Sequence, residues 1–576
     1  MKRSHNNKRW IFYIIAVCIP IAILLLIEAT LRLINYGQDV ALFIDNPANQ
    51  HYQVTRPDIL KAYFAEQAEL PSVALEPSFL LKQKPSNGLR IVVQGGSTAA
   101  GFPYGMGASI AGILDQRMRQ TFPQRYVEVI NTAMSAVNSY SLLDMADEII
   151  DIQPDAVFIY AGHNEYLGIL GVGSSYAASQ SYWLTRSMLW LNDWRIFQFV
   201  RSLTFAILQS SAPTESENTA PRTFMAKVAK HKNIPLNSTM YEAGLLQFER
   251  NMRALLAKYR ANNIPVYIAT VASNLSDQAP FASAALNQEQ EGLLNALQNQ
   301  ERPLTEASIA KISDKINASN NAQLHYEFAQ IMRANKQFSL AKVHFIQAKE
   351  HDLLRFRAPE AINKIIARLA QDESFHLVPA YQALAKRSPN GIIGEQLMLE
   401  HLHPNLQGYY VVANSFYDSF FQASSIAPKI YVDINRAWQQ RLVLPSEEYL
   451  GFATIQKLKA DYPFVSSPQQ IKLPRTSDWQ QELGLKRFNK TINWLEMMEN
   501  ALQRYQQTQN HKMANKTTQI LADAMPHHGL YNQQTADIMM KQMRLSEALY
   551  YYQRAKLAGA IGLEVTISQL QTRTAK

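Results

Sequence analysis

The chain has 576 residues, of which 47% are hydrophobic and 18% are charged, as is typical of globular proteins that bury a full core. The formal net charge is +9, but four cationic residues precede residue 10 and the others form no basic run, which argues against a nucleic-acid partner. The only cysteine, Cys18, excludes an intramolecular disulfide and a cluster of thiolate metal ligands. A chain of this length predicts about two to four domains.

The N-terminal segment resembles a membrane anchor. Residues 10–27 form an apolar run interrupted only by Pro20, and at about 1.5 Å per helical residue this run spans a bilayer core. A cleaved signal peptide has a shorter apolar core, and here the run passes directly into a helical pattern at 28–34. We therefore expect residues 1–35 to be a cytoplasmic tip and a single-pass anchor, rather than a signal peptide or a buried helix. Since cationic flanks stay in the cytoplasm, the remaining chain is expected to be extracytoplasmic, which in a bacterium means periplasmic at the inner membrane.

Residues 36–88 contain five prolines and predict an irregular lead-in, after which strands and helices alternate. This alternation predicts a parallel sheet covered by helices on both faces. Ligands of such sheets bind beyond the carboxyl ends of the strands, where the turns at Ser97, 133–138 and 162–165 converge. The predicted strands lie at 91–94, 127–131, 156–160 and 266–271, and the predicted helices at about 105–121, 139–152 and 241–262.

Ser97 is the first candidate for chemistry. It follows an apolar strand and the pair Gly95–Gly96, so it lies in a tight turn where a helix begins at the edge of the sheet. Such a position suits a nucleophile, although a serine that only caps the helix is the alternative. Ala99 stands where a nucleophile elbow needs glycine, and the phosphate-loop and dinucleotide patterns are absent from this stretch.

A second cluster of polar residues lies at Glu400–Pro404. Pro404 disfavours helical geometry at His403, which we expect on a loop before a helix that starts near Asn405. An imidazole on this loop can take a proton from a serine while Glu400, three residues upstream, orients it. The alternatives are a surface or capping histidine and a His-x-His metal site, for which no third cluster of ligands stands out.

Three further regions are predicted to be helical. Residues 182–208 are rich in Trp and Phe and form a core or cap helix, a lid over an acyl pocket, or a surface resting on the membrane. A polar loop is expected at 210–221. Residues 280–350 and 430–576 read as helical, and both contain small and aromatic residues at the positions of a 34-residue tetratricopeptide helix pair. These positions are Ala329, Ala341, Phe345 and Ala348, and later Ala536, Ala548, Tyr552 and Ala555.

Four short blocks, in order along the chain, resemble the SGNH hydrolases, also called the GDSL esterase/lipase family. Three of the blocks depart from the family's usual residues: Gly96 replaces an aspartate, Ala136 a glycine, and Glu400 an aspartate. The blocks are Gly95-Gly-Ser97, Asn131-Thr-Ala-Met-Ser-Ala136, Gly162-His-Asn-Glu165 and Glu400-x-x-His403-Pro404.

The resemblance implies a three-layer α/β/α sandwich of the flavodoxin-like SGNH type over residues 89–428. Insertions are expected at about 171–235 and 280–352, the latter tetratricopeptide-like, with a separate helical domain of the same kind at 429–576. It also implies acyl transfer, with Ser97 as nucleophile, His403 as base and Glu400 as its partner. The oxyanion would be met by the N–H groups of Ser97 and Ala136 and by the side-chain amide of Asn164.

No metal or organic cofactor is implied. The expected substrate is an ester, either lipid-like or an acylated carbohydrate, and the helical units are a possible surface for a protein partner. Two rival interpretations stay open at this point. The chain is an O-acyltransferase or deacylase acting on envelope polysaccharide, or it is a membrane-tethered scaffold whose hydrolase fold has lost its activity.

Overall fold

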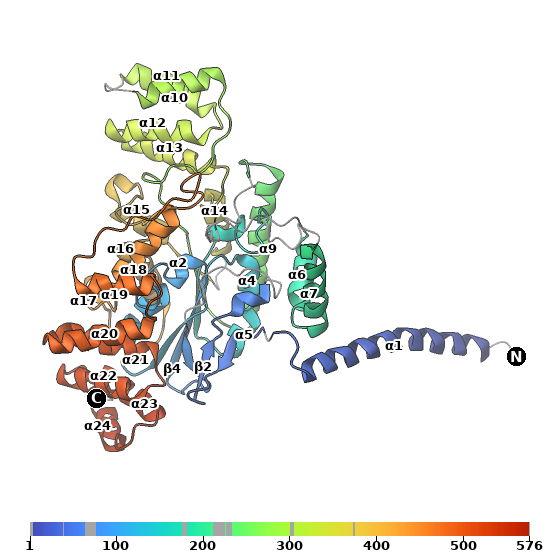
Figure 1. Ribbon diagram of the computed structural model, residues 1–576, viewed down its shortest axis with the longest axis vertical. Helices are drawn as coiled ribbons and strands as arrows, with labels where there is room; N and C mark the ends of the chain where they lie inside the picture. Colours follow the sequence, from blue (N-terminus) through green and yellow to red (C-terminus); the bar gives the residue numbers. More distant parts are fainter. Residues whose placement is uncertain are drawn as a thin grey trace.

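The computed structural model describes residues 4–38, 40–63, 77–174, 181–210, 225, 233–299, 305–371 and 375–574. Figure 1 shows a central body from which helix α1 (Ser4–Leu33) projects, with one group of helices above it and the C-terminal helices below. The loop predicted at 210–221 lies, apart from its first residue, outside the described residues.

The centre of the body is a five-stranded sheet in which every neighbouring pair is parallel, with the order β5-β4-β6-β7-β8. All four predicted strands are confirmed, and each is fully or almost fully buried, as apolar runs between helical layers must be. The strand at the far edge, β8, was not predicted. The strands are β4 (Gly88–Gly95), β5 (Tyr126–Asn131), β6 (Ala156–Tyr160), β7 (Val266–Ala269) and β8 (Phe375–Val378).

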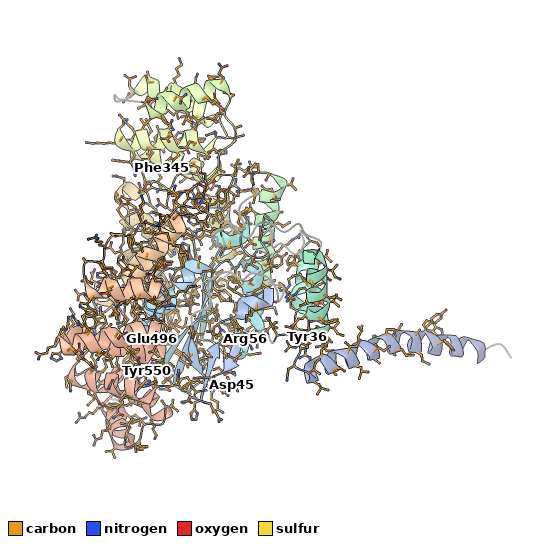
Figure 2. All side chains as sticks on the ribbon, in the orientation of Figure 1. Tyr36, Asp45, Arg56, Phe345, Glu496 and Tyr550 are labelled. Carbon is orange, nitrogen blue, oxygen red and sulfur yellow. The ribbon has the colours of Figure 1, made fainter. Side chains whose placement is uncertain are left out.

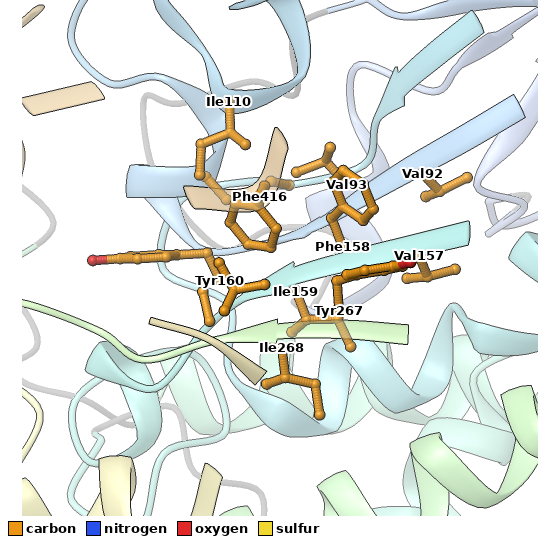
Figure 3. Close-up of a cluster of buried hydrophobic side chains, with 14 of the residues drawn as sticks. Val92, Val93, Ile110, Val157, Phe158, Ile159, Tyr160, Tyr267, Ile268 and Phe416 are labelled. Carbon is orange, nitrogen blue, oxygen red and sulfur yellow. The ribbon is translucent and has the colours of Figure 1, made fainter. Parts of the chain in front are cut away.

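Helices pack on both faces of this sheet. On one face, Phe158 of β6 stacks on Phe416 of α16, with ring centroids 5.2 Å apart (Figure 3). On the other face, the Gln94 side chain of β4 donates to the Leu142 carbonyl of α4 and accepts from the Tyr259 hydroxyl of α9. The helices around the sheet are α2 (Ser97–Ala100), α3 (Ile110–Thr121), α4 (Ser139–Asp144), α5 (Ala146–Asp151), α9 (Thr239–Ala261), α14 (Glu360–Leu369), α15 (Ala380–Arg387) and α16 (Leu406–Ala423).

The lead-in differs from the prediction, because it contains a three-stranded antiparallel sheet. Its last strand is fixed by buried groups of the main sheet: the Leu81 amide donates to Glu128, and its carbonyl accepts from Arg90 at 2.7 Å. Glu128 is 47 positions from Leu81, so patterns within the lead-in could not show this contact. The strands are β1 (Phe43–Asp45), β2 (Tyr52–Thr55) and β3 (Phe79–Leu81).

The Trp- and Phe-rich segment forms two helices instead of one, α6 (Tyr182–Leu191) and α7 (Arg195–Ser210). The chain turns at Asn192, whose carbonyl accepts a 2.8 Å hydrogen bond from the Gln198 side chain. The first two amides of α7 donate to the Glu28 carboxylate of α1. The break in the helix therefore coincides with the contact to the N-terminal helix.

The remaining regions are helical, as predicted. In α12–α13 and α22–α23 all eight small and aromatic positions are buried between the two helices or against their neighbours. The assignment of these pairs to a 34-residue repeat stays a prediction. The upper helices are α10 (Gln288–Gln298), α11 (Glu306–Asn317), α12 (Ala322–Ala334) and α13 (Phe338–Glu350). The C-terminal helices are α17 (Ile434–Gln439), α18 (Pro445–Lys459), α19 (Trp479–Phe488), α20 (Trp494–Gln507), α21 (His511–Ala524), α22 (Gly529–Lys541), α23 (Leu545–Leu557) and α24 (Glu564–Thr574).

The C-terminal helices pack on the first strand–helix unit of the sheet. Arg119 of α3 makes two 2.9 Å hydrogen bonds to the Asp523 carboxylate of α21. The Tyr550 hydroxyl of α23, labelled in Figure 2, donates to the Val127 carbonyl of β5. Burial acts to raise the pKa of Asp523, but the guanidinium of Arg119 holds it below its ordinary value. This carboxylate is therefore ionised and paired inside the interface.

Among the described helices, α1 contains the one stretch that is long and apolar enough to cross a membrane, Phe12–Leu33. Its 22 residues include a window with a mean hydropathy of 2.7, of which 6% is buried inside the protein. A helix of this kind near an N-terminus is a membrane span or a signal sequence.

Candidate active site

Ser97 begins α2 directly after β4, at the carboxyl edge of the sheet. The turn needs glycine at position 95, because a Cβ there would collide with the Tyr160 carbonyl of the neighbouring strand. The Ser97 side chain is half-buried and engages a histidine from a distant loop instead of capping its own helix.

That histidine is His403, whose Nε2 lies 2.7 Å from Ser97 Oγ. Its loop is held on both sides, since the Leu399 amide donates to the His403 carbonyl and Asn405 caps α16 through the Gly408 amide. The Phe102 ring packs on the imidazole with centroids 4.7 Å apart. The structure thus brings together two residues that are 306 positions apart in the sequence.

Glu400 lies behind His403, on the side away from the serine. One carboxylate oxygen contacts His403 Nδ1 and also accepts the His403 amide at 3.0 Å. Burial lowers the pKa of His403 to about 3, so the imidazole is neutral at pH 7 and can accept a proton at Nε2. The adjacent carboxylate opposes this shift, because it stabilises the protonated ring.

The predicted oxyanion donors come from two other turns of the sheet. Ala136 has a φ of +67°, a left-handed conformation that glycine adopts with less strain. Asn164 Nδ2 donates to the Val137 carbonyl at 2.9 Å, which ties these two turns together. The same nitrogen lies 2.8 Å from the position that a Cβ on Gly96 would occupy. Asn164 therefore fills the space beside the serine that Gly96 leaves open.

Two buried residues that support the site were given no catalytic role from the sequence, although His401 was considered as one ligand of a His-x-His metal site. Glu165 accepts hydrogen bonds from the Ser139 hydroxyl at 2.7 Å and the Gln247 amide at 2.6 Å, which holds the Asn164 turn against α4 and α9. Burial raises the pKa of Glu165 to about 7. His401 contacts the second oxygen of Glu400 and lies among three phenylalanine rings. Both residues lie within the sequence blocks that resemble the family, and this position was the signal that could have identified them.

The metal site considered for the two histidines would need at least a third ligand. In the described part of the chain, the structure contains no group of three or more His, Cys, Asp or Glu side chains arranged to hold a metal ion. His401 and His403 instead contact the two oxygens of one carboxylate, with their ring centroids 6.0 Å apart.

Comparisons with known proteins gave matches among solved structures only. No family model matches the chain, and no curated protein matches its sequence. A GDSL-like lipase from Bacteroides thetaiotaomicron is 13% identical, covers 60% of this chain and 93% of its own, and gives a TM-score of 0.24. A catalytic mutant of an acetylxylan esterase from Geobacillus stearothermophilus is 13% identical, with coverages of 58% and 96% and a TM-score of 0.26. The acetyl xylan esterase AlAXEase is 14% identical, with coverages of 57% and 98% and a TM-score of 0.26.

One of the three is named a GDSL-like lipase, the term also used for the family that the four sequence blocks resemble.

Proposed function

We propose that the chain is a membrane-anchored serine esterase of the SGNH type. The observation that carries this proposal is the contact between Ser97 Oγ and His403 Nε2 at 2.7 Å, with the Glu400 carboxylate on the opposite ring nitrogen. A hydroxyl, a neutral buried imidazole and an orienting carboxylate in this order are the parts of an activated nucleophile.

In this mechanism His403 takes the proton of Ser97 as the serine oxygen attacks the ester carbonyl carbon. The charge that develops on the carbonyl oxygen is met by the N–H groups of Ser97 and Ala136 and by the Asn164 amide. Glu400 stabilises the imidazolium, which then protonates the leaving alcohol. Water, activated by the same histidine, attacks the acyl-serine and restores the free hydroxyl. A sugar hydroxyl in place of water would make the same intermediate an acyl donor.

The fold assignment follows the order of the strands. The order 2-1-3-4-5 with helices on both faces is that of flavodoxin-like sheets, in which ligands bind at the carboxyl ends. This supports a three-layer domain over residues 89–428, with insertions at about 171–235 and 280–352. We propose that the helical domain at 429–576 and the helix pair α12–α13 are tetratricopeptide-like units that offer a surface to a protein partner.

The proposed location is the cytoplasmic membrane, with the body on the periplasmic side. Glu28 lies within the apolar stretch of α1 and accepts the Arg195 amide at 3.1 Å and the Ile196 amide at 2.9 Å. Since a cleaved signal peptide would take this cap away from α7, the contact supports a retained anchor. An ester carried by a lipid or an acylated carbohydrate would then be met at the membrane surface.

The experiment that tests this proposal is hydrolysis of short- and medium-chain p-nitrophenyl esters by the full chain in detergent. Ser97→Ala and His403→Ala are expected to lower kcat/KM by about 10⁴-fold or more. Ser568→Ala, an exposed serine on α24, is the matched control and is expected to keep full activity. Activity that survives in the Ser97 variant, with circular dichroism unchanged, would overturn the proposed role of that serine.

A further inference from the structure

The helices α6 and α7 expose a large apolar surface, here termed the hairpin face. Apolar side chains on the surface of a soluble body are normally scattered, and contiguous patches mark sites of contact with a partner or a membrane. The hairpin face consists of side chains that are 45–76% exposed: Trp183, Leu184, Trp190, Phe199, Val200, Leu203 and Ile207.

The exposure follows the helical period. On α7, positions 199, 200, 203 and 207 form one stripe, as on an amphipathic helix. Such a stripe ordinarily faces the core, but here it faces outward. The core-facing side of α6 is occupied by other residues: Leu189 is buried, and the Tyr182 ring packs on Tyr140 of α4 at 5.9 Å. The hairpin thus binds the body with one side and leaves its apolar side uncovered.

The hairpin is attached to the end of the apolar helix α1. Besides the Glu28 cap of α7, the Arg32 guanidinium donates to the Asp193 carbonyl at 2.9 Å. Directly after α1, the ring of Tyr36, labelled in Figure 2, packs edge-on against Phe199, with ring centroids 5.5 Å apart. These contacts place the hairpin at a fixed height along α1.

That height corresponds to the edge of a bilayer. Glu28 precedes the end of the apolar stretch, Leu33, by about 8 Å at 1.5 Å per residue. Figure 1 shows α6 and α7 on the side of the body from which α1 projects, running across the direction of α1. Amphipathic helices lie at this depth, at the boundary between headgroups and acyl chains, where they insert their apolar side and where tryptophan is enriched.

We propose that the hairpin face inserts into the interfacial layer of the same bilayer that α1 crosses. This inference rests on the retained anchor of the proposed function. Lipid is favoured over a protein partner because α7 is attached to α1, whose apolar stretch is almost unburied, and because the face carries two exposed tryptophans. The body is then held by two membrane contacts, so its orientation on the bilayer is fixed.

The test uses the full chain in lipid nanodiscs, with spin labels on single cysteines. Val200→Cys and Val343→Cys, each in a Cys18→Ala background, form a matched pair because the two valines are 53% and 52% exposed. Val343 lies on α13, far from α1 (Figure 1). We expect the label at 200 to collide severalfold more with oxygen than with a water-soluble nickel chelate, and the label at 343 to show the reverse.

A third sample, the unaltered chain labelled at Cys18, reports on the anchor alone. If Cys18 is in lipid while position 200 is as water-accessible as position 343, the assignment of α1 as an anchor is supported and the hairpin proposal is overturned. A label at 200 that is shielded from both reagents indicates a second copy or another protein on the hairpin face, which also overturns it. If Cys18 is not in lipid, the anchor and the hairpin proposal fail together. Circular dichroism of all samples controls for folding.

Discussion

The two sides of the candidate site differ in how they accommodate unusual residues. On the acid–base side, Ser97, His403 and Glu400 are in direct contact, and the longer side chain of Glu400 still reaches the imidazole. On the oxyanion side, Ala136 adopts a left-handed backbone conformation that disfavours any side chain. The longer Glu400 side chain is therefore accommodated by side-chain geometry, whereas the methyl group of Ala136 is accommodated by backbone strain.

Gly96 and Asn164 extend this comparison. Gly96 has no side chain, and the Asn164 amide nitrogen lies in the space beside the serine that a side chain at position 96 would need. We expect the acid–base side to depend on charge and the oxyanion side to depend on shape, and four substitutions separate these dependences.

The largest effect is expected for Glu400→Gln. Loss of the orienting carboxylate should lower kcat by up to about 10⁴-fold. Burial lowers the pKa of His403, and a carboxylate beside the ring acts in the opposite direction because it stabilises the imidazolium. Its removal should therefore move the acid limb of the kcat/KM profile to lower pH. The measurement is ester hydrolysis between about pH 2 and 8, a range that includes a limb set by a pKa of about 3, with Glu400→Asp as the charge-retaining control. An acid limb that moves to higher pH in the Gln variant would contradict the assignment.

Asn164→Ala should follow, since it removes one of the proposed donors to the oxyanion. We expect kcat to fall by about 10²–10³-fold while KM changes little, because the donor acts mainly in the transition state. Steady-state kinetics on a p-nitrophenyl ester measure this split. A rise in KM with unchanged kcat would show that Asn164 holds the substrate and does not stabilise the transition state.

Gly96→Ala should have a smaller effect on activity. The added Cβ would lie 2.8 Å from Asn164 Nδ2 and displace this amide, which should lower kcat roughly 10- to 100-fold. In an Asn164→Ala background the same change should have little further effect, since the two residues act through one contact. Gly292→Ala is the control, because a Cβ there meets no atom within 4 Å. Equal losses in both backgrounds would refute the coupling.

Ala136→Gly should have the smallest effect. Removal of the methyl group relieves the left-handed strain but adds backbone freedom to the unfolded chain, so the free energy of unfolding should rise by at most about 1 kcal/mol. Ala133→Gly, in the same turn but without a left-handed φ, should instead lower it by about 0.5–1 kcal/mol. Denaturant unfolding of the two variants measures the difference. If the Ala136 variant lost as much stability as the Ala133 variant, the claim of backbone strain at Ala136 would be contradicted.

Local signals account for what the sequence predicted. The buried strands were visible as apolar runs followed by glycine turns, and the contact between Glu400 and His403 arises within one tight turn. The fifth strand, β8, was missed because it has only four residues and the polar His376 interrupts them, so the run lacks a continuous apolar signal. The last strand of the lead-in, β3, is held in part by Glu128, 47 positions beyond Leu81.

Contacts between residues far apart in the sequence explain what was not predicted. The fit of Asn164 beside Gly96 joins two turns 68 positions apart, and no pattern within either block shows it. The break between α6 and α7 depends on a cap from Glu28, more than 160 positions away. The outward direction of the hairpin face follows from that attachment, so the sequence showed an apolar segment but not which side it would expose.

The most direct test of the central claim is covalent labelling of the full chain with a fluorophosphonate, followed by peptide mapping. The account predicts one adduct, on Ser97, that is lost in His403→Ala although the variant remains folded. Absence of an adduct on a folded chain, or labelling of another serine in its place, would contradict the assignment of Ser97 and His403 as an activated nucleophile and its base.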